Sequence, residues 1–441
     1  KPVNFKLGQI KERRHGETSK KSKKTPADRR DSITLKEEFS EREAKRPIVI
    51  VDPRAGHGAG IGGSKEASEI GLALSFGHDV YFLFFDTDPI PGQTLSDVKN
   101  AQIKFLEEII RLHPNAPRPA IVGNCQGGWA SALLASDRPD LVGPLMMNGA
   151  PLSYWGGIGH KNSMRYLGGM LGGVWLNSFY GDMGNGVFDG ANLVLNMELA
   201  TFTANYWTKY YNLFSKADTE EKRYLDYERW SSAYFRLTTE EIHQIAGDLF
   251  IGNKLEQNKF YLDGDTPIDL KEIDDPVFVF ASEGDYIAPP QQALYWIPEI
   301  YGTVEEIKRR QQVIIYMVHP EIGHLGIFVS TAIAKKEQQE IIGNIELIDY
   351  LFPGLYEMVI TKDPSKEWMN DYQVRFEERE MEDIYKYCDG YHDRDAFKRV
   401  AVVSEINDNY YRKYFRPWVQ MFANDSTAEM QRSFQPLRVQ R

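Results

Sequence analysis

Residues 119–131 read Pro-Ala-Ile-Val-Gly-Asn-Cys-Gln-Gly-Gly-Trp-Ala-Ser: a short apolar run, a glycine-flanked cysteine and the start of a helix. A chain that reverses sharply from strand to helix needs residues without a Cβ beside the turn, and Gly123 and Gly127 meet that need. Such a turn lifts the side chain of Cys125 clear of the sheet, at the positive end of the helix, which favours the thiolate. We therefore predict that Cys125 is a nucleophile; a buried structural cysteine is the alternative.

From residue 47 onward, apolar segments alternate with segments of helical period. The helical segments between the early strands are 64–76, 95–113 and 126–137. Because the apolar segments are rich in Val, Ile and Phe, they are typical of strands buried on both faces. The pattern predicts an α/β fold, a mostly parallel sheet with helices on both faces. The predicted strands are 47–52, 79–85, 120–123, 142–148, 276–281 and 312–318.

Composition divides the 441 residues further. Residues 1–46 hold 15 Lys and Arg against 8 Asp and Glu, a net charge of +7 in a chain of net −11, and predict a flexible, solvated leader. Binding of this leader to nucleic acid or to an anionic surface is the alternative. Residues 47–150 and 275–353 form the predicted core. Residues 151–274, dense in Trp, Tyr, Phe, Met and Gly, predict a helical cap insertion, and residues 354–441 a charged, aromatic helical tail.

The same composition argues against several classes of protein. The body after residue 46 carries a net charge of −18 (−11 minus +7), which argues against nucleic acid as the main partner. No apolar run approaches the ~20 residues of a membrane span, and no signal-peptide pattern opens the chain. Two cysteines, Cys125 and Cys388, make a disulfide framework improbable and predict a reducing, cytoplasmic location. Since the first residue is not Met, whether residues precede Lys1 stays open.

A cysteine nucleophile on such a turn needs an acid and a base, which follow it in that order along the chain. Asp285 lies four residues after the strand that ends at Ala281. After the last predicted core strand the sequence offers His319 and His324. We favour His324 as the base, because the small apolar stretch after it can pack the imidazole in place, and keep His319 in reserve. Asp285 would orient the imidazole and stabilise its charge.

Two backbone N–H groups should bind the developing oxyanion. One is that of Gln126, directly after the nucleophile, and the other comes from Arg54 or Ala55 in the loop after the first core strand. The same loop contains Gly58-Ala-Gly60-Ile-Gly-Gly63, a weak match to the dinucleotide-binding pattern, because its first glycine lies six residues beyond Asp52. No Cys/His cluster has zinc spacing. The chain is therefore expected to need neither a metal nor a cofactor.

These motifs resemble those of poly(3-hydroxyalkanoate) synthases, members of the α/β-hydrolase superfamily, and more closely an uncharacterised bacterial branch related to them. The resemblance rests on Gly123–Gly128, Asp285–Pro289 and Gly323-His324, and covers roughly residues 47–360. It implies an α/β-hydrolase fold and acyl transfer from a hydroxyacyl-CoA thioester to a growing polyester, with Cys125 carrying the acyl group. Tyr286 and Pro290 stand where the synthases usually have a histidine and a tryptophan.

Three hypotheses for function follow. The first is a cysteine-dependent acyltransferase of the polyester-synthase type, and the second is an ester or thioester hydrolase with the same Cys125, His324 and Asp285. The third, from another class, is a non-catalytic scaffold or granule-associated protein that binds through the basic leader and the aromatic tail. The expected partners are a small acyl thioester or ester and, for the first hypothesis, a polyester chain. The resemblance and the aromatic tail also suggest a homodimer.

Overall fold

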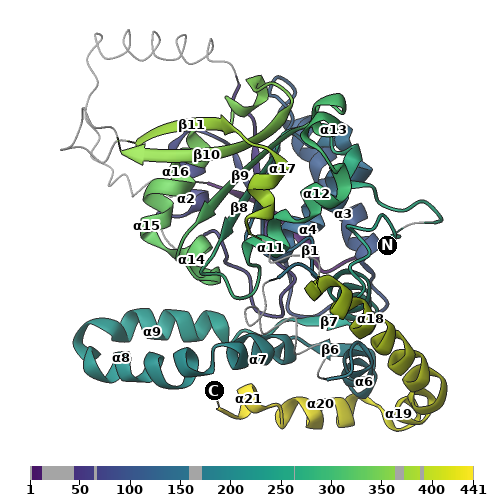
Figure 1. Cartoon of the computed structure of the whole chain (residues 1–441). Coiled ribbons are helices and arrows are strands. Elements are labelled where there is room, and N and C mark those ends of the chain that lie inside the picture. Colours follow the sequence, from purple (N-terminus) through teal and green to yellow (C-terminus); the bar gives the residue numbers. More distant parts are fainter. Residues whose placement is uncertain are drawn as a thin grey trace.

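A computed structural model describes residues 2–11, 44–63, 67–157, 171–262, 264–362, 372–387 and 392–440. Most of the predicted leader, including its Lys20–Lys24 run, lies outside the described residues, and so does Cys388. Within the described ranges the chain forms a nine-stranded sheet with helices on both faces and a separate layer of helices on one side (Figure 1).

The central sheet has the strand order β1-β3-β2-β4-β5-β8-β9-β10-β11. All neighbouring strands from β3 to β10 run parallel, whereas β1 and β11 pair antiparallel at the two edges. A mostly parallel sheet whose fourth strand leads through a glycine-flanked turn into a helix is the α/β-hydrolase fold, so the predicted fold class is confirmed. The strands are β1 (Phe5–Ile10), β2 (Ile48–Val51), β3 (Val80–Phe85), β4 (Ala120–Asn124), β5 (Leu145–Asn148), β8 (Val277–Ser282), β9 (Val313–His319), β10 (Gly354–Lys362) and β11 (Tyr372–Glu378).

Each face of the sheet packs against its own hydrophobic cluster. Along β2, Val49 and Val51 belong to one cluster and Ile48 and Ile50 to the other, as the two-residue period of a strand requires. The first cluster is covered by α3 (Leu95–Leu112), α4 (Gln126–Asp137), α11 (Pro290–Leu294), α12 (Trp296–Tyr301), α13 (Val304–Arg309) and α17 (Met381–Tyr385). The second is covered by α2 (Glu69–Ser75), α14 (His324–Val329), α15 (Thr331–Ile333), η5 (Ala334–Gln338) and α16 (Gln339–Gly343).

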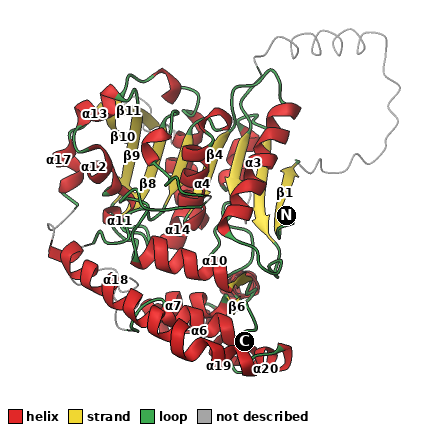
Figure 2. Ribbon diagram, turned by 90° about the vertical axis from the view of Figure 1, so that its right-hand side faces the viewer, coloured by secondary structure: helices red, strands yellow, loops and turns green. Residues whose placement is uncertain are grey.

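A helical layer, built from two distant parts of the chain, lies beside one end of the sheet (Figures 1 and 2). Partly buried ion pairs join the two parts: Arg416 binds Asp182, and Arg438 binds Asp189. The first part holds α6 (Trp175–Met183), β6 (Val187–Asp189), α7 (Ala191–Ala200), η2 (Ala204–Thr208), α8 (Lys209–Ser215), α9 (Ala217–Ser231), β7 (Arg236–Thr238), α10 (Thr239–Gln244) and η3 (Ile245–Ile251). The second holds α18 (His392–Tyr410), η8 (Tyr411–Phe415), α19 (Arg416–Phe422), α20 (Asp425–Ser433) and α21 (Pro436–Gln440).

Two predicted boundaries are wrong. Residues 5–10 of the predicted leader form β1, which pairs with β3 in a register that sets Phe5 opposite Phe85, and the two rings lie 4.3 Å apart. The predicted charged, aromatic helical tail begins instead with β10 and β11, which extend the sheet. Both segments are rich in charged residues. Because their composition was averaged over a longer stretch, it did not reveal strands of six to nine residues.

Short helical turns complete the described chain: η1 (Pro139–Leu141), η4 (Leu270–Glu272) and η6 (Ile348–Tyr350). Across the described residues, none of the helices combines the length and the apolar character that crossing a membrane requires.

Candidate active site

Cys125 lies on the turn between β4 and α4, in a backbone conformation that non-glycine residues rarely adopt. Its φ is 52° and its ψ is −119°. A Cβ added to Gly123 would lie 2.6 Å from the carbonyl oxygen of Gly127, and one on Gly127 would lie 2.4 Å from that of Val51. Both glycines are therefore required by the close approach of strand and helix. A residue strained in this way by well-packed surroundings is a frequent mark of a functional site.

The turn is held to the neighbouring strand. The amide N–H of Cys125 donates to the carbonyl oxygen of Asn148 at the end of β5 (2.8 Å), and the N–H of Gly128 donates to the carbonyl of Cys125 (3.0 Å). The side chain of Cys125 is buried, with 6% of the residue exposed. The sulfur is thus fixed above the end of the sheet, at the start of a twelve-residue helix whose dipole favours a negative charge there.

His324 connects Cys125 to Asp285. Its Nε2 lies 3.1 Å from Sγ of Cys125, and its Nδ1 lies 2.6 Å from Oδ2 of Asp285. Oδ1 of Asp285 accepts from the backbone N–H groups of Ile287 (2.8 Å) and Ala288 (2.9 Å). The three side chains come from the ends of three different strands, and they form one hydrogen-bonded chain in the order that a nucleophile, a base and an acid require.

The loops that carry Asp285 and His324 touch each other. A Cβ on Gly284 would lie 2.0 Å from the carbonyl oxygen of Glu321, and Oγ of Ser282 donates to the carbonyl of Ile322 (2.6 Å). The imidazole of His324 packs edge-on against Phe328, with ring centres 5.2 Å apart. These contacts fix the distance between the acid and the base.

Electrostatics favour a charged His324. Burial by itself lowers the pKa of this imidazole, but the charges of Asp285 and Cys125 and the hydrogen bonds to both raise it well above its ordinary value. The favoured state of His324 is therefore the imidazolium, and a positive charge beside a cysteine sulfur stabilises the thiolate, the form that attacks carbonyl carbons.

His319, the reserve candidate for the base, lies elsewhere. Its Nδ1 accepts from the backbone N–H groups of Glu321 (3.1 Å) and Ile322 (3.0 Å). It holds the loop between β9 and α14 in shape and makes no described contact with Cys125.

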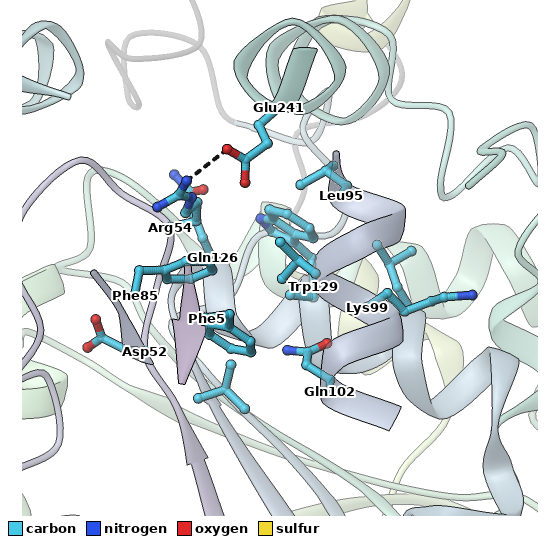
Figure 3. A pocket seen from close by; sticks show the side chains of 15 residues that line it. Phe5, Asp52, Arg54, Phe85, Leu95, Lys99, Gln102, Gln126, Trp129 and Glu241 are labelled. Atoms are coloured by element: carbon cyan, nitrogen blue, oxygen red, sulfur yellow. Dashed lines mark hydrogen bonds and ion pairs between the residues drawn. The ribbon is translucent and has the colours of Figure 1, made fainter. Parts of the chain in front are cut away.

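The predicted oxyanion residues separate into two environments. Ala55 and Gln126 line the cavity onto which Cys125 opens. The side chain of Arg54 turns away to Glu241 in α10, with 2.8 Å between Nη2 and Oε2 (Figure 3). This buried ion pair lies over the ring of Phe85 and joins the helical layer to the loop after β2. Of the two loop residues, Ala55 is the one that lines this cavity.

The glycine-rich loop after β2 does not offer a phosphate site. The N–H of Gly60 donates to Oδ1 of Asp52 (3.3 Å), and the indole of Trp230 donates to the carbonyl of Gly58 (3.0 Å). Burial raises the pKa of Asp52 well above its usual range, against the hydrogen bonds from Gly60 and Ile61. A buried carboxyl group occupies the donors that a pyrophosphate would need, which disfavours the dinucleotide interpretation.

The cavity above Cys125 has a volume of about 350 Å³. Most of its wall comes from the helical layer: Leu176, Leu193, Met197 and Phe250 from the first part, and Phe397 from α18. A mostly apolar chamber of this size accommodates a short acyl group.

A polar network beneath the turn was not predicted from the sequence. The carboxylate of Glu69 accepts from the amides of Asn124 (2.6 Å), Asn148 (2.9 Å) and Gln338 (3.2 Å), and all four side chains are buried. Burial raises the pKa of Glu69 to about 7, against the hydrogen bonds from Asn124 and Asn148. Asn124 and Asn148 end two adjacent strands, which is the signal that could have revealed the network. Glu69 and Gln338 carry no such local signal.

Comparison with known proteins identifies the family. Residues 31–441 match a family described as protein of unknown function (DUF3141). The chain belongs to this family. It is 48% identical over 407 residues to an uncharacterized protein in the ackA 5′ region of Rhizobium meliloti; the match covers 90% of this chain but 55% of that protein, so the chain spans about half of its relative's length.

The predicted relation to polyester synthases is confirmed as a distant sequence similarity. The chain is 26% identical over 312 residues to the poly(3-hydroxyalkanoate) polymerase subunit PhaC of Thiocystis violacea, covering 68% of this chain and 80% of that protein. Among solved structures, a monoacylglycerol lipase of Paleococcus ferrophilus aligns with a TM-score of 0.38 and 15% identity, covering 68% of this chain and 95% of the lipase. The chain thus combines an α/β-hydrolase fold with a distant sequence relation to PhaC.

Proposed function

We propose that this chain is an acyltransferase that carries a hydroxyacyl group on Cys125, with His324 as base and Asp285 as its orienting acid. The observation that supports the proposal most is the hydrogen-bonded chain in which His324 contacts both Sγ of Cys125 (3.1 Å) and Oδ2 of Asp285 (2.6 Å). The relation to PhaC supports hydroxyacyl thioesters as substrates and a polyester hydroxyl as acceptor.

The first half of the reaction loads the enzyme. The thiolate of Cys125 bonds to the carbonyl carbon of the thioester, and the backbone N–H groups of Gln126 and Ala55 bind the oxygen as it becomes negative. The bond between the acyl carbon and the leaving sulfur then breaks, and imidazolium His324 gives its proton to the departing thiolate.

The second half transfers the acyl group. Neutral His324 takes the proton of an acceptor hydroxyl, whose oxygen bonds to the acyl carbon while the bond to Sγ breaks. Cys125 leaves as thiolate beside imidazolium His324, which restores the starting state. These steps need no cofactor. If water takes the place of the hydroxyl, the same residues perform hydrolysis.

The test is incubation with 3-hydroxybutyryl-CoA, following free CoA and the mass of the peptide that contains Cys125. We expect CoA release, an acyl adduct on Cys125 and an oligomeric ester product. Cys125→Ala should abolish the adduct and keep the fold, whereas the matched control Cys388→Ala should retain the adduct.

The alternatives give different results. An adduct with free 3-hydroxybutyrate as the only product would establish the hydrolase. An unmodified Cys125 with intact thioester would contradict acyl transfer from this substrate and favour the scaffold. Loss of folding in Cys125→Ala would show that the cysteine is structural.

A further inference from the structure

Tyr154 carries a buried hydroxyl group that the steps above do not use. It lies in the segment after β5 and lines the same cavity as Cys125. Only 9% of the residue is exposed, and its Oη has no hydrogen-bond partner among the described residues. Because buried hydroxyl groups in folded proteins are nearly always hydrogen-bonded, an unpaired one in the wall of a substrate cavity points to a partner on the substrate.

The position of Tyr154 is fixed from three sides. Its backbone N–H donates to Oδ1 of Asn253 (2.9 Å), and its carbonyl oxygen accepts from Nε2 of Gln292 (3.0 Å). Its ring packs against that of Phe250, with centres 4.3 Å apart. Asn253 and Phe250 belong to the helical layer, whereas Gln292 belongs to α11 of the core. A hydroxyl held in this way does not have to reorganise when a substrate binds, which is the property of an effective electrostatic catalyst.

The phenol is also a hydrogen-bond donor at neutral pH. Burial and then the negative charge of Cys125 raise the pKa of Tyr154 above its ordinary value, so the oxygen keeps its proton. Tyr154 and the sulfur-bearing Cys125 line the same cavity. The carbonyl oxygen of an acyl group on Cys125 is two bonds from that sulfur.

We propose that Tyr154 is a further catalytic residue, whose phenol O–H donates a hydrogen bond to the carbonyl oxygen of the acyl group as Sγ of Cys125 attacks it. This inference rests on the proposed function and deepens it. The hydroxyl supplements the backbone N–H groups of Gln126 and Ala55, and it acts most strongly when the oxygen carries the negative charge of the tetrahedral intermediate.

The test compares two reagents on Tyr154→Phe, which removes one oxygen and keeps the ring against Phe250. p-Nitrophenyl acetate transfers an acetyl group through an intermediate with a negative carbonyl oxygen, whereas methyl methanethiosulfonate attaches a thiomethyl group without any carbonyl. Both rates are read from the mass of the peptide that contains Cys125, in a Cys388→Ala background. We expect acetylation to slow about 100-fold and thiomethylation to change by less than about 2-fold, because that reaction makes no oxyanion.

Tyr301→Phe is the matched control, since Tyr301 is also buried, with 6% of the residue exposed, but lies in α12 and is not among the described residues that line this cavity. We expect both of its rates to equal those of the parent protein. Equal slowing of both reactions in Tyr154→Phe would assign Tyr154 to packing or to thiolate stability and overturn the proposal, as would unchanged acetylation.

The experiment also separates this inference from the function on which it rests. If Cys125 of the parent protein accepts thiomethyl but never acetyl, acyl transfer itself fails. If the parent protein is acetylated and Tyr154→Phe is acetylated equally fast, only the role of Tyr154 fails.

Discussion

The end of the sheet that carries Cys125 and the helical layer beside it place their side chains in opposite ways. At this end of the sheet, the polar side chains of Glu69, Asn124 and Asn148 are buried and hydrogen-bonded to one another. In the helical layer, large apolar side chains face outward: Phe214 is 84% exposed and Trp207 is 70% exposed. The buried polar side chains hold the turn of Cys125 to its neighbouring strand, whereas the layer supplies most of the wall of the cavity.

The two regions also contain glycines with different amounts of room. A Cβ on Gly123 or Gly127, at the turn that carries Cys125, would lie within 2.6 Å of a backbone atom, whereas a Cβ on Gly247 in η3 of the helical layer would have its nearest neighbour, a methyl group of Val174, at 3.7 Å. We therefore expect the same substitution to have effects of different size at these positions.

The largest combined loss, of stability and of Cys125 reactivity, is expected at Gly123. A Cβ in Gly123→Ala would lie 2.6 Å from backbone atoms of Gly127 and Gly128, so the turn must open. We expect the free energy of unfolding to fall by about 3 kcal/mol, together with a loss of Cys125 reactivity. Gly247→Ala, the matched change in the helical layer, should alter stability by less than about 1 kcal/mol. Urea unfolding measures both, and equal losses would contradict the distinction between the regions.

The ionisation of Glu69 is expected to change the free energy of unfolding by no more than Gly123→Ala does. Its pKa rises on folding from 4.5 to about 7, so the folded state binds the proton more tightly than the unfolded state between these values. Stability from this group is present below pH 4.5 and is lost as the pH rises to about 7. Glu69→Gln cannot ionise, so its stability relative to the parent protein should increase over this range by on the order of 3 kcal/mol. Urea unfolding at pH 5 and pH 8 measures the change, and parallel pH profiles for the two proteins would refute it.

The smallest effect is expected at the exposed surface of the helical layer. Phe214→Ala removes a ring that is 84% exposed and should change the free energy of unfolding by less than about 0.5 kcal/mol. Phe280→Ala in β8, where the ring is fully buried, should cost about 3–5 kcal/mol. A large loss in Phe214→Ala, measured by thermal unfolding across protein concentrations, would show that this surface is covered in solution.

The candidate site could be predicted where its residues carry local signals. Cys125 stands between glycines that only a sharp turn requires, and Asp285 and His324 follow apolar strands in the expected order. The choice of His324 over His319 rested on the apolar residues after it, and the structure brings His324 to the sulfur. The catalytic roles of these residues remain a prediction that the acylation experiment tests.

Other parts of the site carry no local signal. Tyr154 is one of many aromatic residues after residue 150, and only its buried, unpaired hydroxyl distinguishes it. Glu69 begins a short helix, where a charged residue is expected to face solvent, yet it is 1% exposed beneath the turn of Cys125. Strands β1, β10 and β11 were missed because their pairing partners, rather than their composition, make them strands.

The sequence by itself determined the order of the core strands and helices, the turn that carries Cys125, and the positions of Asp285 and His324 after it. These features depend on residue type and on spacing along the chain. The tertiary structure decided which long-range partners meet: Glu69 with Asn148, Arg54 with Glu241, and Phe397 of the distant α18 with the cavity above Cys125. Contacts between segments far apart in the sequence are set by how buried surfaces fit together, and no short segment contains the information for that fit.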